Sequence, residues 1–268
     1  MEYWAILSGI EGNLTAYEAV LADIKRQRHP VSSLYLLGDV VGPHPESEAL
    51  VQRIQKQRRG ELEPQICLGW WEEQCLILYG LGRISEPTSL IEKYGMPMVK
   101  TLWDSVSRQT VEWMRSLEFG IYELDCLLVH GSSVGVEDTL TPETPVQILL
   151  DRLLRFGANN LFCGRSGLAF QYEIKESAIA STIQTLNHAA QTQSVTITAR
   201  QIVGVGNVGR TAGEATYTLY DPGTNRVQFQ TVRYGHFKGF RLPNRSKTIA
   251  AKQRARPPRL EMNQKKNE

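Results

Sequence analysis

The stretch Leu34–Gly42, with the sequence LYLLGDVVG, decides the fold class. Its first four residues are apolar and indicate a buried strand, which ends in a glycine turn that carries an acid, Asp39. The same order of strand, glycine turn and amphipathic helix begins at Tyr3–Leu7, and a third strand is expected at Gln65–Leu68. Strands separated by helices pair in parallel. The loops that follow them are therefore expected along one carboxyl edge of a sheet, where α/β proteins place their sites.

Helical and extended patterns alternate along the rest of the chain. Residues 85–117 are expected to be helical, and a helix opened by Pro145 is expected to end at Gly157. Further short strands are predicted at Gly120–Leu124, Cys126–His130, Asn160–Cys163, Ile202–Val205, Thr216–Tyr220 and Val227–Val232. Residues 177–193 fit either a helix or a loop and are left unassigned. A chain of 268 residues with 41% hydrophobic residues is long enough for one large α/β domain.

The charge of the chain is distributed unevenly. Residues 238–268 hold ten Lys or Arg and two Glu, a local charge of +8; since the whole chain carries +2, residues 1–237 carry −6. Because residues 238–268 are also poor in apolar side chains, we expect a basic, disordered tail after a domain that spans residues 1–237. Two interpretations of the tail stay open: a solvated extension, or a tether to nucleic acid, an anionic membrane or an acidic protein.

The sequence shows no targeting signal, and this, together with the spacing of its cysteines, leads us to expect a cytoplasmic protein. No run approaches the roughly 20 apolar residues of a membrane span, and the N-terminal sequence MEYW does not resemble a signal peptide. The four cysteines lack the paired spacing of a metal site, so we expect them to be reduced and buried: Cys67, Cys75, Cys126 and Cys163.

Five glycine-centred blocks fall at the ends of predicted strands. They are SGIEGN at 8–13, GDVVG at 38–42, GWWE at 69–72, VHGS at 129–132 and GRSG at 164–167. Their order and spacing resemble the calcineurin-like metallophosphoesterases, particularly the small bacterial phosphodiesterase-like branch. The segment GNVG at 206–209 and the strand-like run Ala215–Asp221 are similar to the last turn and closing strand of that branch. The resemblance implies an α/β, four-layer αββα sandwich of two mixed sheets flanked by helices, with the site at the strand ends.

The resembled family holds two divalent metals through Asp, His and Asn side chains, and this sequence departs from that pattern. By the resemblance, Gly9 and Glu11 replace an Asp and a His of the first block. Trp70 and Trp71 replace the metal-binding Asn and the phosphate-contacting His of the third block. Arg165 and Gly167 replace both histidines of the fifth block.

Three residues of the implied site are kept in this sequence. By the resemblance, Asp39 is the metal-bridging carboxylate, His130 is a second ligand, and Glu72 keeps an acidic position beside the catalytic His. Neither metal position reaches the three or four protein ligands that usually hold a transition metal. We therefore expect no bimetal centre and no cofactor. The alternative is a single weakly bound Mn, Zn or Fe held by Asp39, His130 and Glu11.

The altered residues suggest how the site is rebuilt without metal. A buried Asp39 needs a partner, and we expect Arg165, together with His130, to pair with it and to reach Glu11. Gly9 and Gly167 delete side chains where Trp70 and Trp71 add them, which suggests that an indole fills the old cavity. Three simpler interpretations stay open. One tryptophan could point inward and the other outward, His130 could be only a hydrogen-bonded histidine, and Glu72 could be a structural or solvated acid.

Three functions are compatible with this sequence. The leading hypothesis is a catalytically inactive metallophosphoesterase-like protein, a pseudoenzyme that serves as a binding, scaffold or regulatory module. The first alternative is a residual metal-dependent phosphoesterase or phosphodiesterase with at most one metal. The second alternative is a metal-free receptor for an anionic ligand, held by Arg165 with Trp70 and Trp71.

Overall fold

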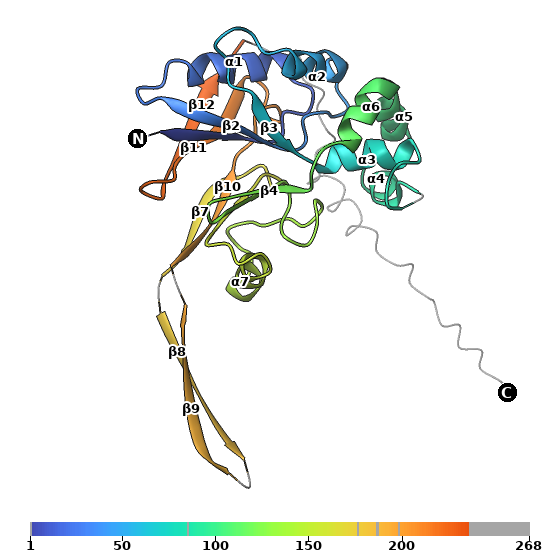
Figure 1. Ribbon diagram of the computed structural model, residues 1–268. Helices are drawn as coiled ribbons and strands as arrows, with labels where there is room; N and C mark the ends of the chain where they lie inside the picture. The colour runs from blue at the N-terminus through green and yellow to red at the C-terminus, as the bar shows by residue number, and fades with distance from the viewer. Residues whose placement is uncertain (1, 85, 176, 186–187, 198, 236–268) are drawn as a thin grey trace, which may run out of the picture. The chain divides into compact units, whose positions relative to one another are not determined.

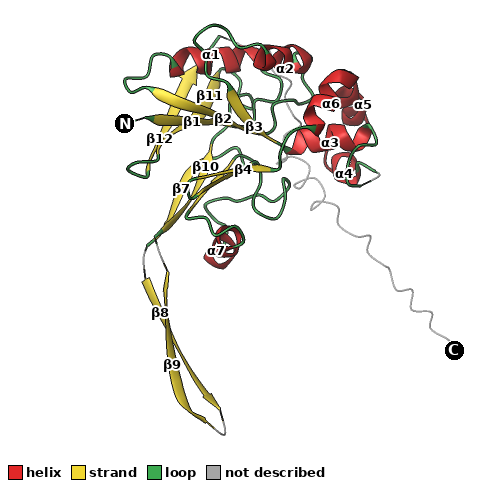
Figure 2. Ribbon diagram, in the orientation of Figure 1, coloured by secondary structure: helices red, strands yellow, loops and turns green. Residues whose placement is uncertain are grey.

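The computed structural model describes residues 2–84, 86–175, 177–185, 188–197 and 199–235. The predicted basic tail and its boundary at residue 237 lie outside these residues. Two five-stranded sheets form the centre of the fold (Figures 1 and 2). Sheet 1 has the order β12 (Arg226–Arg233), β11 (Glu214–Asp221), β1 (Tyr3–Leu7), β2 (Val31–Leu37) and β3 (Pro64–Cys67). Sheet 2 has the order β4 (Gly120–Glu123), β5 (Cys126–Val129), β6 (Asn160–Cys163), β10 (Arg200–Val205) and β7 (Ala169–Ile174).

Both sheets are mixed, as the sequence predicted. Strands β1, β2 and β3 pair in parallel, and so do β5, β6 and β10. The pairs β1–β11, β11–β12, β4–β5 and β10–β7 are antiparallel. The parallel strands place the loops after β1, β2, β5, β6 and β10 at one edge of the fold, which is the edge that carries the glycine-centred blocks.

Helices cover the outer faces of both sheets. Helices α1 (Leu14–Ile24) and α2 (Ser47–Gln55) pack on sheet 1, and α7 (Val146–Leu154) packs on sheet 2 (Figure 1). Asn13 caps α1 by accepting a hydrogen bond from the backbone N–H of Ala16 at 3.0 Å. The predicted helical stretch 85–117 contains three helices, α4 (Thr88–Tyr94), α5 (Met96–Asp104) and α6 (Arg108–Arg115), which gather beside α3 (Trp70–Leu78).

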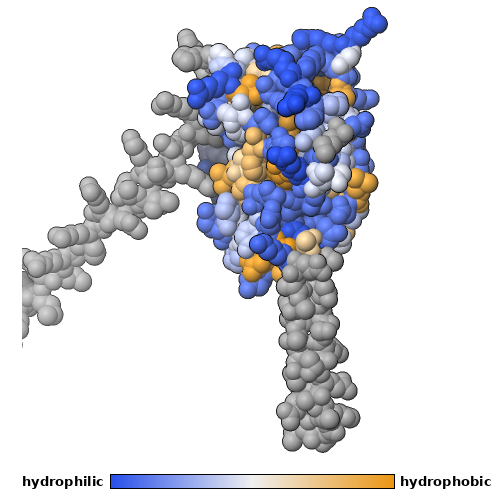
Figure 3. Space-filling model, turned by 90° about the vertical axis from the view of Figure 1, so that its left-hand side faces the viewer, coloured by the Kyte–Doolittle hydropathy of each residue, from blue (hydrophilic) through white to orange (hydrophobic). Residues whose placement is uncertain are grey.

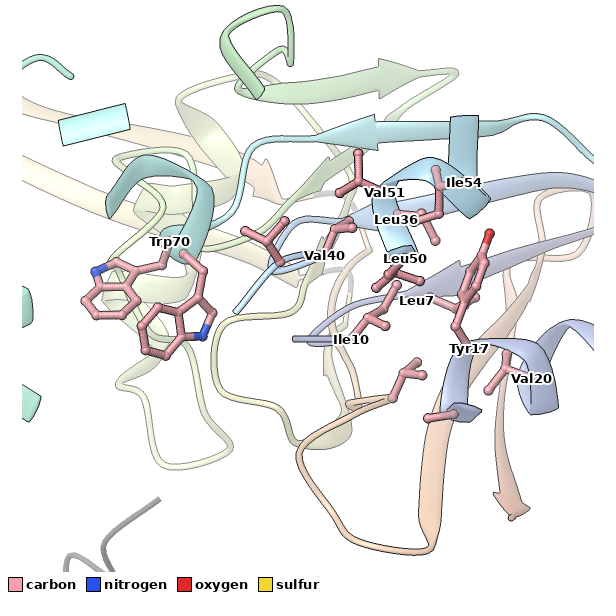
Figure 4. Close-up of a cluster of buried hydrophobic side chains, with 14 of the residues drawn as sticks. Leu7, Ile10, Tyr17, Val20, Leu36, Val40, Leu50, Val51, Ile54 and Trp70 are labelled. Atoms are coloured by element: carbon pink, nitrogen blue, oxygen red, sulfur yellow. The ribbon is translucent and has the colours of Figure 1, made fainter. Parts of the chain in front are cut away.

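The core lies in three layers. Between the sheets, buried aromatic and aliphatic side chains pack together, among them Trp4, Ile6, Tyr35, Leu37, Phe162 and Tyr220. A second cluster joins sheet 1 to its helices; Figure 4 shows Tyr17 of α1 and Leu50 of α2 facing Leu7 and Leu36 of the strands. A third joins sheet 2 to α7 through Leu149 and Leu153. The predicted four-layer αββα sandwich is therefore confirmed.

The unassigned residues 177–193 lie in two strands, apart from residues 186 and 187, which fall outside the described residues. The strands are β8 (Ser177–Thr185) and β9 (His188–Ile197), which follow β7 and precede β10 in the chain and pair antiparallel as a separate two-stranded sheet. The sequence prediction failed here because small polar residues alternate with only a few aliphatic ones, so no helical or strand period dominates.

The four cysteines are buried and free, as predicted. Hydrophilic side chains dominate the face of the molecule drawn in Figure 3, with smaller hydrophobic areas between them. In the part of the chain that the structure describes, every helix is too short or too polar to cross a bilayer.

Candidate functional site

Backbone hydrogen bonds join the loops at the carboxyl edge of the sheets. The loop after β1 is tied to the loop after β2 by Glu11 N–H donating to the carbonyl of Asp39 at 2.8 Å. Gly209, in the loop after β10, donates to the carbonyl of Gly9 at 2.8 Å. Arg165, after β6, donates its backbone N–H to the carbonyl of His130, after β5, at 2.7 Å. Gly206, directly after β10, donates its backbone N–H to the carbonyl of Leu168, in the loop after β6, at 3.1 Å. The five loops therefore form one connected site, although they are far apart in the sequence.

Asp39 lies at the centre of this site and is completely buried. Its Oδ2 atom accepts a hydrogen bond from Nη2 of Arg210 at 2.8 Å, and its Oδ1 atom accepts one from the backbone N–H of Trp71 at 2.9 Å. Nε2 of His130 lies 3.2 Å from Oδ2, and Nη1 of Arg165 lies 3.8 Å from it. Burial opposes ionisation, but the positive charges of His130, Arg210 and Arg165 outweigh it and hold the pKa of Asp39 well below its usual value.

Arg210 is the main partner of Asp39, and sequence reasoning missed it. Its Nε atom donates to Glu11 at 2.6 Å, Nη2 donates to Asp39 at 2.8 Å, and Nη1 donates to the backbone carbonyl of Arg165 at 3.0 Å. Burial disfavours its charge, but Glu11 and Asp39 outweigh that effect and raise the pKa of Arg210. The guanidinium is therefore held as a cation by two carboxylates, in the fork geometry that arginine provides.

The two glycines of the altered blocks make room for this guanidinium. A Cβ atom built on Gly9 would lie 3.0 Å from Nε of Arg210, and one on Gly167 would lie 2.7 Å from Nη1. Both glycines also have positive φ angles, +59° and +70°, which other residues rarely adopt. The space that was expected to hold an indole is thus filled by Arg210.

Trp70 and Trp71 begin α3 and are both buried, at 0% and 1% exposure. Their rings meet edge to face with centroids 4.7 Å apart, and both contact the ring of Tyr94 in α4. Figure 4 shows Trp70 at one end of the core cluster on sheet 1. The alternative of one inward and one outward tryptophan is therefore wrong, because α4 covers this end of α3. Neither ring offers an exposed face to a ligand.

Arg165 lies against Trp70. Its Cζ atom is 4.5 Å from the centre of the indole, and its side chain is 8% exposed. Its contact with Asp39, at 3.8 Å, is longer than that of Arg210. Within the described residues, the guanidinium of Arg165 donates no hydrogen bond to the protein. Arg165 is therefore a secondary source of positive charge near Asp39, and its N–H donors are available.

His130 contacts two acceptors. Its Nδ1 atom lies 2.8 Å from the carbonyl oxygen of Leu37, which can only accept, so Nδ1 carries a proton. Its Nε2 atom faces the Asp39 carboxylate at 3.2 Å. Nε2 makes no hydrogen bond within the described part of the chain. His130 is therefore fixed by the Leu37 carbonyl and lies directly against Asp39.

Glu72 has a structural position. Its carboxylate accepts hydrogen bonds from three backbone N–H groups, those of Gly69 at 3.0 Å, Asp39 at 2.8 Å and Val41 at 2.9 Å. Burial, together with the negative charge of Asp39, raises the pKa of Glu72 to about 8, while the backbone N–H groups of Val41 and Asp39 act in the opposite direction. The Glu72 side chain caps the N-terminus of α3 and hydrogen-bonds it to the loop after β2.

The residues of this site do not fit the two metals that the resembled fold implies. Arg210 lies between Glu11 and Asp39, so a cation there would meet a guanidinium already bonded to both carboxylates. Across the described ranges, no three His, Cys, Asp or Glu side chains gather in a way that could hold a metal ion. The donor set is therefore short of ligands, and its central position is occupied by protein.

Comparison with solved structures defines the fold. A metallophosphoesterase from Sphaerobacter thermophilus matches with a TM-score of 0.60 and 19% sequence identity, over 87% of this chain and 89% of that chain. This chain has the calcineurin-like metallophosphoesterase fold. The protein TT1561 of Thermus thermophilus also matches, with a TM-score of 0.41 and 10% identity, over 86% of this chain and 99% of that one. No family model and no curated protein matches the sequence. At these identities the likeness concerns the metallophosphoesterase fold alone, and the chemistry depends on the residues present.

Proposed function

We propose that this protein is a non-catalytic metallophosphoesterase-like protein that serves as a binding, scaffold or regulatory module. One observation carries the proposal: the guanidinium of Arg210 is hydrogen-bonded to both Glu11 and Asp39. It supplies positive charge to a buried carboxylate, as a metal would. A guanidinium has no open coordination position and cannot turn a bound water into hydroxide, so two-metal phosphoester chemistry has no route through it.

Metal content and turnover test this proposal. The purified chain, incubated with Mn²⁺, Zn²⁺ or Fe²⁺ and then desalted, is expected to retain far less than one metal per chain by mass spectrometry. It is also expected to leave a generic phosphodiester intact. The alternative of a residual hydrolase predicts about one metal per chain, which Glu11→Gln would weaken, and activity that Asp39→Asn would abolish. That result would reject the non-catalytic interpretation.

A second candidate function, an anion receptor, is favoured by the available donors of Arg165. Its guanidinium is fixed against Trp70 and is slightly exposed, so an anion could pair with it without breaking a hydrogen bond inside the described protein. The buried tryptophans then act only by holding Arg165 in place. The binding group would be a phosphate or a carboxylate, which matches the planar donor fork of arginine.

Thermal stabilisation by phosphate tests this candidate. Inorganic phosphate or pyrophosphate at about 100 times its dissociation constant should stabilise the native state by about 2.7 kcal/mol, which raises the melting temperature measurably. Arg165→Ala should abolish the shift. Arg155→Ala is the matched control, because Arg155 is half exposed and paired with Asp151 on α7, and it should leave the shift unchanged. Equal shifts in all three proteins would mean a general salt effect and would reject a receptor role for Arg165.

A further inference from the structure

The hairpin of β8 and β9 has two open backbone edges. It forms a sheet of its own, with register from Ser177 opposite Ile197 to Thr185 opposite His188. An isolated two-stranded hairpin is at best marginally stable in water, and a third strand is normally needed. The outer N–H and C=O groups of both strands have no neighbouring strand among the described elements. The hairpin is therefore a template on which a further strand can add.

The hairpin sequence lacks the residues that usually protect such edges. Residues 177–199 contain no Lys, Arg, Asp or Glu, whereas 22% of the whole chain is charged. Neither strand, SAIASTIQT or HAAQTQSVTI, contains Pro or Gly. Natural edge strands are commonly guarded by charges or prolines. The absence of both from the sequence of 177–199 indicates that pairing at this edge is tolerated or used.

The two edges of the hairpin are not equivalent. Near the turn, the register shifts between the pairs Ile183–Gln191 and Thr185–His188, so β9 carries one residue more than β8. An extra residue is a bulge, which bends a strand and disturbs its outer edge. Strand β8 keeps a regular spacing over its length and is the edge better suited to pairing.

We propose that β8 pairs edge to edge with β8 of a second copy of this chain, antiparallel and around a two-fold axis at Ser181. The sequence of β8 is nearly symmetric about Ser181. Antiparallel pairing there sets Ile179 opposite Ile183 of the second copy, twice, and Ala180 opposite Thr182. The four-stranded sheet that results has the order β9, β8, β8, β9 and completes the hydrogen bonding of each inner strand.

The charge and the sequence symmetry of β8 favour a second copy of this chain as its partner. A strand without charge meets its own copy with no like-charge repulsion, whereas an acidic or basic partner would find no complement on it. Period-two alternation assigns positions 179 and 183 to one face of the hairpin, together with positions 195 and 197, which lie opposite 179 and 177. Pairing two hairpins joins these aliphatic positions into one continuous stripe.

Cysteine cross-linking of the full chain locates the axis. Ser181→Cys places a thiol on the axis, where paired Cα atoms lie about 4.5 to 5.5 Å apart, within reach of a disulfide. Mild oxidation should give a covalent dimer on a non-reducing gel. Thr192→Cys on β9 is the matched control, because it lies outside the proposed interface, and it should stay monomeric. The four native cysteines are buried, so the unmodified chain should give little background.

Sedimentation velocity supplies the second readout. The full chain should show a concentration-dependent monomer–dimer equilibrium in the micromolar range. Ile179→Lys should weaken it by about tenfold or more, since 1.4 kcal/mol corresponds to a factor of ten, while Thr192→Lys should change it little. A chain that stays monomeric throughout, a dimer indifferent to Ile179→Lys, or equal cross-linking at positions 181 and 192 would overturn the proposal.

Discussion

Replacing Arg210 with alanine is expected to lower the free energy of unfolding by about 3–5 kcal/mol, because it leaves a buried carboxylate without its principal partner. Asp39 would keep the backbone N–H of Trp71, the contact with His130 and the more distant Arg165, and Glu11 would lose its only ion pair among the described side chains. Chemical denaturation in urea, at constant m-value, measures the change.

Two further variants keep this prediction testable. Arg155→Ala removes a half-exposed arginine and should cost no more than about 0.5 kcal/mol. If Arg210→Ala is too unstable to purify, the double variant Arg210→Met, Asp39→Asn removes both charges together and should recover part of the loss. A cost below about 1 kcal/mol for Arg210→Ala would show that Asp39 does not depend on this guanidinium.

Adding one methyl group at Gly167, as Gly167→Ala, is expected to lower the free energy of unfolding by about 2–3 kcal/mol. The new Cβ would lie 2.7 Å from Nη1 of Arg210, and Gly167 has a φ of +70°, so steric overlap adds to backbone strain of about 1 kcal/mol. Denaturant unfolding of Gly167→Ala gives the value. Gly157→Ala is the matched control: its φ is +64° and nothing lies within 4 Å of its Cβ position, so it should show the backbone strain alone.

The double-mutant cycle identifies the cause. In an Arg210→Ala background, Gly167→Ala should cost about as little as Gly157→Ala, because the guanidinium that it overlaps is gone. An unchanged cost of Gly167→Ala in that background would mean that Gly167 serves the turn itself and does not make room for Arg210.

The parallel strands and their loops could be predicted because the signals are local. The run Leu34–Leu37 is apolar, its glycine turn follows at once, and Asn13 caps the helix that the stripe of apolar residues indicated. Where such periodicity is weak, as in β8 and β9, no assignment could be made from the sequence. The stretch 85–117 was predicted as helical, and the start of its last helix at Ser107 followed from the sequence, although the break at Gly95 was not placed.

The partner of Asp39 could not be predicted in the same way. Arg210 reaches Asp39 from 171 residues away through the loop after β10, and the residue types next to it do not distinguish it from the other arginines of the chain. The only sequence signal was its position directly after the recognised GNVG turn at 206–209. The inward position of both tryptophans likewise depends on α4 covering the start of α3, which is a tertiary effect that no local pattern reports.

The most direct test of a protein cation in place of metal is a crystal of the full chain soaked in millimolar Mn²⁺. Anomalous difference maps locate manganese by its own scattering, so they distinguish it from water and from protein atoms. We predict no anomalous peak within ligand distance of Asp39 and His130, with the guanidinium of Arg210 between Asp39 and Glu11. One or two peaks at that position, with Arg210 displaced, would contradict the account.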